Sequence, residues 1–302
     1  MSTGPFGRCA AAMITPFAED GSLDLDGAQR LAAHLVGRGG CDALVVSGTT
    51  GESPTTTDAE KAALVRAVVE AVGERASVVA GVGTADTRHT LALARAAEAA
   101  GAHGLLVVTP YYSRPTQEAI VQHLLTVADG TGLPVMLYDI PARTGTGTAL
   151  TAASLHRLAE HERIVAGKDC AADPLKSGLV MAGTDLAYYS GSDETNLPLL
   201  ALGAAGCVST VANVAGRQGR AVLDAFAAGD HAPAARRHGA LLPLVGAVMG
   251  EGPGTVAGKA LCRVAGLPGG PVRAPLLPAG EELTGRLVDA LKTALGSPVW
   301  EG

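Results

Sequence analysis

Short apolar segments recur along the chain, each bounded by glycine, proline or polar residues. Runs of this kind are typical of strands that are covered on both faces. Eight such strands are predicted, at residues 10–14, 43–47, 77–82, 104–109, 134–138, 164–168, 187–190 and 207–210. Apolar residues at helical spacing lie between most of them, at 26–38, 58–72, 87–100, 117–128 and 151–161. Asp26 and Asp58 are the predicted N-caps of the first two helices.

The number of strand–helix units separates two architectures. Eight units need about 200–250 residues, and the eighth predicted strand ends at Thr210. A doubly wound sheet also alternates strands and helices, but its common strand orders stop near five or six. We therefore predict an α/β fold, a (β/α)8 TIM barrel in residues 1–216. Four further helical segments, at 218–228, 232–249, 254–266 and 281–295, predict a C-terminal helical appendix in residues 217–302.

Composition and charge narrow the class of protein. Of the 302 residues, 47% are apolar and only 3% aromatic, so the core must consist mainly of alanine, valine and leucine. The net charge of −6 is spread without blocks, which argues against nucleic acid or an anionic membrane surface as a partner. We expect no membrane span and no signal peptide. Five scattered cysteines without a Cys-x-x-Cys pair fit a reducing cytoplasm.

Lys168 is the most informative single residue, because active sites of such barrels lie at the C-terminal ends of the strands. It directly ends the sixth predicted strand, after the apolar run 164–167. Desolvation there is expected to lower its pKa and to leave a nucleophilic amine near neutral pH. The alternative is a structural ion pair with Asp169. The other lysines, at 61, 176, 259 and 292, lie in polar or helical segments and are predicted at the surface.

Hydroxyl groups at neighbouring strand ends favour an imine-forming lysine. Thr49 and Thr50 follow the second strand, and Tyr112 and Tyr138 lie at the ends of the fourth and fifth. Making and breaking a carbinolamine requires groups that carry protons. Arg143, in the turn after the fifth strand, has a forked guanidinium that suits a carboxylate. Tyrosines at an interface and an ordinary exposed arginine are the alternatives.

Signals for a cofactor are weak. Gly81 and Gly83 follow a strand, but the third glycine of a dinucleotide fingerprint is absent. The eight histidines form no His-x-His or His-Glu-x-x-His ligand set. We therefore expect neither a cofactor nor a metal.

Several segments together resemble one family, the pyruvate-dependent class I aldolases of the dihydrodipicolinate synthase and N-acetylneuraminate lyase type. They are 13–17, the Gly-Thr-Thr-Gly-Glu turn at 48–52, 108–112, 138–145 and the strand-ending Lys168. The resemblance covers nearly the whole chain. It implies a (β/α)8 barrel with C-terminal helices and a homotetramer built from tight dimers.

The resemblance also implies catalytic roles by position. Lys168 would form the imine with pyruvate, and Tyr138 would donate and accept protons beside it. Thr49 would join this proton relay. Tyr112 would complete the relay from the partner subunit.

Four further positions would bind substrate. Thr50 would hold the pyruvate carboxylate, and Gly191 and Val208 would line the pyruvate pocket. Arg143 would bind the carboxylate of the second substrate. Synthases of the family carry this arginine for aspartate 4-semialdehyde, whereas the sugar-acid lyases usually have another residue. The favoured reaction is therefore condensation of pyruvate with aspartate 4-semialdehyde, on the route to diaminopimelate and lysine.

Two alternatives remain open, and two segments depart from the family's pattern. The alternatives are a lyase or dehydratase of a 2-keto sugar acid and a non-catalytic binding or regulatory barrel. The departures are residues 169–173 and 251–259. At the positions where lysine-sensitive relatives bind lysine, Tyr111 is kept, but the others become Lys61, Ala85 and His89. This predicts weak or absent inhibition by lysine.

Overall fold

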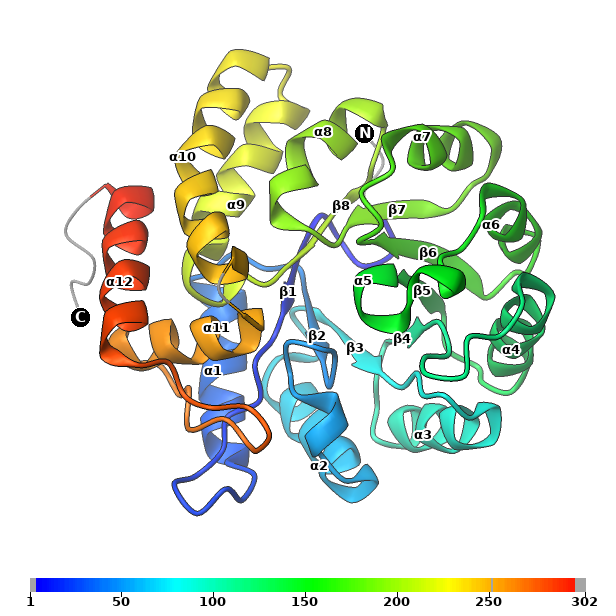
Figure 1. Ribbon diagram of the computed structural model, residues 1–302, viewed down its shortest axis with the longest axis horizontal. Helices are drawn as coiled ribbons and strands as arrows, with labels where there is room; N and C mark the ends of the chain where they lie inside the picture. The colour runs from blue at the N-terminus through cyan, green and yellow to red at the C-terminus, as the bar shows by residue number, and fades with distance from the viewer. Residues whose placement is uncertain (1–3, 251, 297–302) are drawn as a thin grey trace.

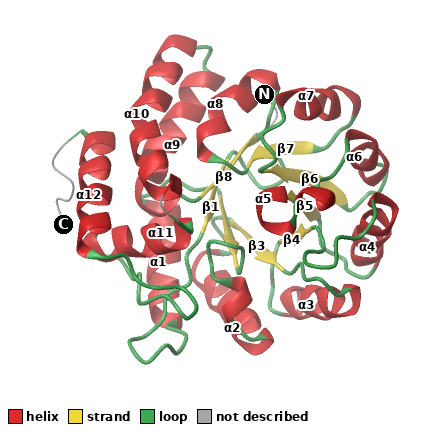
Figure 2. Ribbon diagram, in the orientation of Figure 1, coloured by secondary structure: helices red, strands yellow, loops and turns green. Residues whose placement is uncertain are grey.

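The computed structural model describes residues 4–250 and 252–296. Parallel strands close into a barrel in sequence order, with the last strand paired to the first. Figures 1 and 2 show the strands at the centre and the helices around them. The strands are β1 (Cys9–Ala12), β2 (Ala43–Val46), β3 (Ser77–Gly81), β4 (Gly104–Val108), β5 (Val135–Asp139), β6 (Ile164–Asp169), β7 (Ala187–Ser190) and β8 (Gly206–Ser209). The predicted (β/α)8 barrel is confirmed.

Alternation of side chains along the strands divides the core into two layers. Ala10, Val45, Leu106 and Met136 pack with one another inside the barrel. Their neighbours on each strand, such as Leu44, pack against the surrounding helices. Both faces of the strands are therefore buried, which accounts for the nearly continuous apolar runs.

Most helices lie where the spacing of apolar residues predicts them. They are α1 (Leu25–Gly37), α2 (Asp58–Val72), α3 (Thr87–Ala99), α4 (Gln117–Asp129) and α6 (Ala152–Ala159). The first two caps differ from the prediction. Asp24 caps α1 in place of Asp26, and Thr57 caps α2 in place of Asp58. Asp26 and Asp58 lie in the first turns instead, where a negative charge favours the helix dipole.

Three short helices in the connections after β5, β6 and β7 are not predicted by the pattern. They are α5 (Pro141–Thr144), α7 (Pro174–Gly183) and α8 (Asn196–Leu202), each of which is short and contains proline. Short 3₁₀ turns also occur in the connections after β2, β5 and β7. They are η1 (Ser53–Thr55), η2 (Thr146–Thr148) and η3 (Asp193–Thr195). The loops that carry the site residues are therefore more ordered than their composition indicates.

The C-terminal helices form a group beside β1 and α1 (Figure 1). They are α9 (Ala212–Ala227), α10 (His231–Gly250), α11 (Gly254–Val264) and α12 (Glu281–Leu295). They enclose an apolar cluster of their own that includes Leu244, Leu261 and Leu287. α9 starts directly after β8 and continues past residue 216.

Among the described residues, no single helix has the length and apolar composition of a membrane span. α10 and α11 have that length and composition only when they are taken together, as a pair bent by 117°.

Candidate active site

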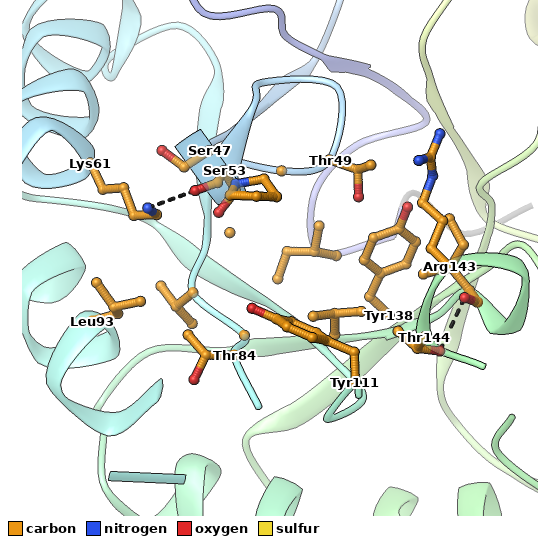
Figure 3. Close-up of a pocket in the computed structure, with 18 of the residues that line it drawn as sticks. Ser47, Thr49, Ser53, Lys61, Thr84, Leu93, Tyr111, Tyr138, Arg143 and Thr144 are labelled. Carbon is orange, nitrogen blue, oxygen red and sulfur yellow. Dashed lines mark hydrogen bonds between the residues drawn. The ribbon is translucent and has the colours of Figure 1, made fainter. Parts of the chain in front are cut away.

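The C-terminal ends of β2 to β5 surround a cavity of about 360 Å³, which we call the mouth cavity. Thr49, Tyr138 and Arg143 lie at one end of it (Figure 3). Lys61 and Leu93 lie at the other end. The remaining walls are formed by Ser47, Gly48, Ser53, Pro54, Thr56, Gly81, Val82, Gly83, Thr84, Leu106, Val108, Tyr111, Ile140 and Thr144. The cavity therefore lies where the fold is expected to place an active site.

Lys168 and Tyr138 lie next to each other inside the barrel. They occupy paired positions on β6 and β5, and Lys168 Nζ is 4.2 Å from the centroid of the Tyr138 ring. Both side chains are buried. Tyr138 lines the mouth cavity, whereas Lys168 contacts the tyrosine without being part of the cavity wall. The amine and the phenol are thus brought together as the sequence predicts.

The charge of the Lys168 amine depends on burial and on the groups next to it. Burial lowers the pKa of Lys168, but Tyr138 and Cys170 raise it, and the net direction is upward. The lowered pKa predicted from desolvation alone is therefore wrong, because it left out two groups that become anions at alkaline pH. Burial also raises the pKa of Tyr138, although Lys168 and Thr49 oppose this shift. The phenol is consequently protonated at neutral pH and able to donate a proton.

Asp169 lies on the opposite face of β6 from Lys168, as successive strand residues do. Its carboxylate accepts hydrogen bonds from Ser177 Oγ at 2.6 Å and from the Tyr188 hydroxyl at 3.1 Å. These contacts lie in the layer between the barrel and its helices. The alternative of a structural Lys168–Asp169 ion pair is therefore wrong.

Two lysines predicted at the surface are not exposed, since Lys259 is buried and Lys176 is half-buried. Lys176 Nζ lies 2.6 Å from Asp139 Oδ2, with its side chain 11% exposed. Lys259 Nζ lies 2.6 Å from Glu52 Oε1, and neither side chain is more than 2% exposed. The prediction failed because each lysine pairs with a carboxylate from a distant element, which the pattern of a single helix does not reveal. The Glu52–Lys259 pair attaches α11 to the Gly-Thr-Thr-Gly-Glu turn.

The two threonines of this turn point to different sides of the barrel mouth. Thr49 lines the mouth cavity beside Tyr138 (Figure 3), and its hydroxyl lowers the pKa of the phenol. The hydroxyl of Thr50 lies 3.1 Å from that of Thr210, which follows β8. Thr255 of α11 donates a hydrogen bond to the carbonyl of Thr50 at 3.2 Å. The C-terminal helices thus support the backbone of the turn directly.

Arg143 lies at the site, and Tyr112 does not. Arg143, on α5, lines the mouth cavity next to Tyr138 and lowers the pKa of that phenol. Tyr111 lines the cavity from the loop after β4. Tyr112 has a left-handed backbone (φ +71°) and is 94% exposed. Within one chain, the described structure therefore leaves Tyr112 outside the cavity.

Gly191, after β7, allows its backbone to approach Lys168 closely. A Cβ at this position would lie 2.9 Å from Lys168 Cε and 2.4 Å from Cys170 Sγ. Val208 on β8 is buried in the inner layer of the core. Cys170 was not identified from the sequence, although it follows Lys168 by two residues and extended chains bring such residues to one side. Gly191, Cys170 and Lys168 therefore form one packed group.

Known proteins resemble this chain over nearly its full length. The sequence model of the dihydrodipicolinate synthetase family matches residues 5–294. A curated relative, 4-hydroxy-tetrahydrodipicolinate synthase 1 of Streptomyces coelicolor, is 63% identical over 95% of this chain and 94% of its own. The 4-hydroxy-tetrahydrodipicolinate synthase of Acidothermus cellulolyticus is 58% identical over 96% of this chain and 93% of its own.

Solved structures agree with this result. A dihydrodipicolinate synthase from Cyanidioschyzon merolae with lysine bound superposes with a TM-score of 0.92 at 36% identity, covering 96% of this chain and 98% of its own. A dihydrodipicolinate synthase from Bacillus anthracis gives 0.91 at 38% identity, covering 98% and 99%. The match to the family's sequence model agrees with the identity to the curated relatives, with the barrel and with the lysine at a strand end. The chain belongs to the dihydrodipicolinate synthetase family.

Proposed function

We propose that the chain condenses pyruvate with L-aspartate 4-semialdehyde to give 4-hydroxy-tetrahydrodipicolinate, in diaminopimelate and lysine biosynthesis. The observation that carries this proposal is the Lys168 amine 4.2 Å from the Tyr138 ring, beside a cavity with Arg143 at the same end. The names of the relatives at 63% and 58% identity support the same reaction over a sugar-acid lyase. The assembled amine and hydroxyl groups argue against a non-catalytic barrel.

The first half of the reaction would take place on Lys168. The Lys168 ammonium first loses a proton to solvent in the mouth cavity. The neutral amine then adds to the ketone carbon of pyruvate, and the carbinolamine, protonated on its hydroxyl by Tyr138, loses water to give an imine. Removal of a methyl proton then gives the enamine. Tyr138, protonated at neutral pH, supplies and recovers the protons, and Thr49 carries them to and from the cavity. Gly191 leaves the space in which the lysine and its adduct move.

The second half would use the Arg143 end of the cavity. The enamine carbon attacks the aldehyde carbon of aspartate semialdehyde, forming the new carbon–carbon bond. The amine of that substrate then attacks the imine carbon, closes the ring and releases Lys168. Arg143 would hold the substrate's carboxylate through a charge-assisted contact. We place Thr50 at the pyruvate carboxylate and Val208 in the wall below it.

The proposal includes a homotetramer built from tight dimers, in a reducing cytoplasm. Tyr112 would enter the site of a partner subunit; its exposure and its left-handed conformation support this role. Leu175 and Leu179 on α7 expose 74% and 54% of their surface and offer a second contact. Sedimentation velocity would detect the assembly. Loss of condensation activity in Tyr112→Phe, with pyruvate binding intact, would support the proposed role of Tyr112 in the proton relay.

Trapping with borohydride tests the central proposal. Pyruvate plus borohydride should add one reduced adduct per chain to the wild-type protein and none to Lys168→Ala. The trapped enzyme should then lose condensation activity with aspartate semialdehyde. Labelling that persists in Lys168→Ala, or an enzyme that cleaves 2-keto sugar acids and ignores aspartate semialdehyde, would contradict the proposal.

A further inference from the structure

Thr210, the residue after β8, contacts Thr50 and has no part in the reaction described so far. We infer that Thr210 is a positioning residue for pyruvate: its hydroxyl donates a hydrogen bond to the hydroxyl of Thr50 and so directs the proton of Thr50 at the pyruvate carboxylate. This inference rests on the proposed function, which places Thr50 at that carboxylate.

The two hydroxyl groups share one hydrogen bond and have one proton left over. Their oxygens lie 3.1 Å apart, and neither hydroxyl has another hydrogen-bond partner among the residues that the structure describes. A threonine hydroxyl has one proton to donate and two lone pairs that accept. When Thr210 donates to Thr50, the proton of Thr50 is free for an acceptor that enters from outside. A carboxylate suits this position, because hydrogen bonds to an ionised oxygen are short and strong.

The backbone of Thr210 is held on both sides by buried side chains. Asp193 Oδ2 accepts hydrogen bonds from the backbone N–H groups of Thr210 and Val211, each at 3.1 Å. The side chain of Asn213 donates to the carbonyl oxygen of Thr210 at 2.8 Å. Asp193 and Asn213 are only 8% and 1% exposed. The place of Thr210 at the barrel mouth is therefore fixed by the fold.

α11 orients Thr210 and Thr50 together. A Cβ at Gly254, the first residue of this helix, would lie 3.1 Å from Thr210 Cγ2, so the methyl group of Thr210 packs against the glycine. The hydroxyl of Thr210 is directed at Thr50 instead. The next residue of α11, Thr255, donates a hydrogen bond to the carbonyl of Thr50 at 3.2 Å. The helix thus holds both partners of the hydroxyl pair in place, as a preorganised binding group requires.

The dependence of the condensation on pyruvate concentration in Thr210→Val tests the inference. Valine keeps the shape of threonine and removes only the hydroxyl. The KM for pyruvate should rise about 2- to 12-fold, as expected for loss of one neutral hydrogen bond. The kcat at saturating pyruvate and the KM for aspartate semialdehyde should stay unchanged. Thr210→Ser, which keeps the hydroxyl, should restore most of the affinity for pyruvate.

A double variant tests whether Thr210 acts through Thr50. Thr50→Val should raise the KM for pyruvate more, about 10- to 150-fold, because it removes the hydrogen bond to the charged group itself. Adding Thr210→Val to Thr50→Val should cause no further loss, since the hydroxyl that Thr210 positions is then absent. Independent losses in the double variant, or a larger loss in Thr210→Val than in Thr50→Val, would overturn the inference.

Methyl pyruvate and Thr184→Val are the controls. The ester lacks the negative charge, so the concentration that half-saturates borohydride trapping should change less in Thr210→Val for methyl pyruvate than for pyruvate. Thr184, whose hydroxyl donates to the Val180 carbonyl at the end of α7, should tolerate valine with a wild-type KM.

Two results separate the inference from the proposed function. A wild-type KM for pyruvate in Thr210→Val, in a protein with unchanged circular dichroism, overturns the inference and leaves the proposed function standing. A wild-type protein that neither traps nor condenses pyruvate overturns both. Thr210→Ala, which also lacks the hydroxyl, repeats the measurement if the valine variant does not fold.

Discussion

The buried ion pair between Glu52 and Lys259 offers a quantitative test of how the catalytic turn is held. Lys259→Met removes the positive charge and keeps an unbranched side chain of similar length. It also removes the hydrogen bond to the Pro271 carbonyl at 2.6 Å and the ammonium 4.1 Å from the Phe17 ring centroid. Glu52 would keep the hydrogen bond from the backbone of Arg273 at 2.9 Å.

The expected cost is large because the carboxylate stays buried. Glu52 Oε1 meets the Lys259 ammonium at 2.6 Å and has no regular hydrogen bond among the described residues. Removing one partner of a buried ion pair typically costs about 3–5 kcal/mol. We expect Lys259→Met to lower the free energy of unfolding by this amount. Adding Glu52→Gln removes the buried charge that has lost its partner. The free energy of unfolding lost in the double variant should therefore be smaller than the sum of the losses in the two single variants, by roughly 0.5–3 kcal/mol.

Urea unfolding followed by circular dichroism, at fixed pH and protein concentration, measures these differences. Synthase activity should also fall in Lys259→Met, because the turn that carries Thr49 loses its anchor on α11. A loss of stability below about 1 kcal/mol, or a double variant whose loss equals the sum of the singles, would refute the reasoning. The pair would then behave like a solvated surface contact.

Two further variants and one added ligand, lysine, test the candidate active site. Arg143→Ala should lower kcat/KM for aspartate semialdehyde about 10- to 150-fold through loss of a charge-assisted contact, with imine formation measured by trapping unchanged. Lysine below millimolar concentration should not inhibit the synthase assay, because Ala85 cannot hydrogen-bond the ligand and His89, paired with Asp58, replaces the anion that would bind its ammonium. Gly191→Ala should slow imine trapping strongly, because its Cβ would overlap Cys170 Sγ at 2.4 Å.

Each of these predictions has a clear contrary result. Equal loss of trapping and condensation in Arg143→Ala would assign the arginine to pyruvate. Inhibition by submillimolar lysine would show that the substituted positions still bind it. Wild-type trapping rates in Gly191→Ala, in a protein with unchanged circular dichroism, would show that Lys168 does not need the space that the glycine leaves.

Local patterns predict the barrel, and its topology then predicts much of the site. Strand ends are visible as places where apolar runs stop, and parallel strands bring all these ends to one rim. Lys168 and Tyr138 meet there because they end adjacent strands in register. α7 and α8 are missed because short helices containing proline have too few turns to show a period.

Contacts between distant segments cannot be predicted in this way. Glu52 and Lys259 form an ion pair although they are far apart in the sequence, and nothing in either segment indicates the other. The net pKa shift of Lys168 depends on Cys170 and Tyr138 as well as on burial. The exposure of Tyr112 likewise follows from the left-handed turn that carries it. Each of these three features can be predicted only when the arrangement of several elements in space is known.

Closure of the barrel between β1 and β8 has a consequence for synthesis on the ribosome. Ala10 pairs with Val208, 198 residues later. At roughly 5–20 residues per second, about 10–40 s pass between the emergence of these two strands. During that time β1 presents an unpaired apolar edge, which is a template for association with other chains. We expect the nascent chain to depend on chaperones until β8 emerges, and the finished chain to be free of that dependence.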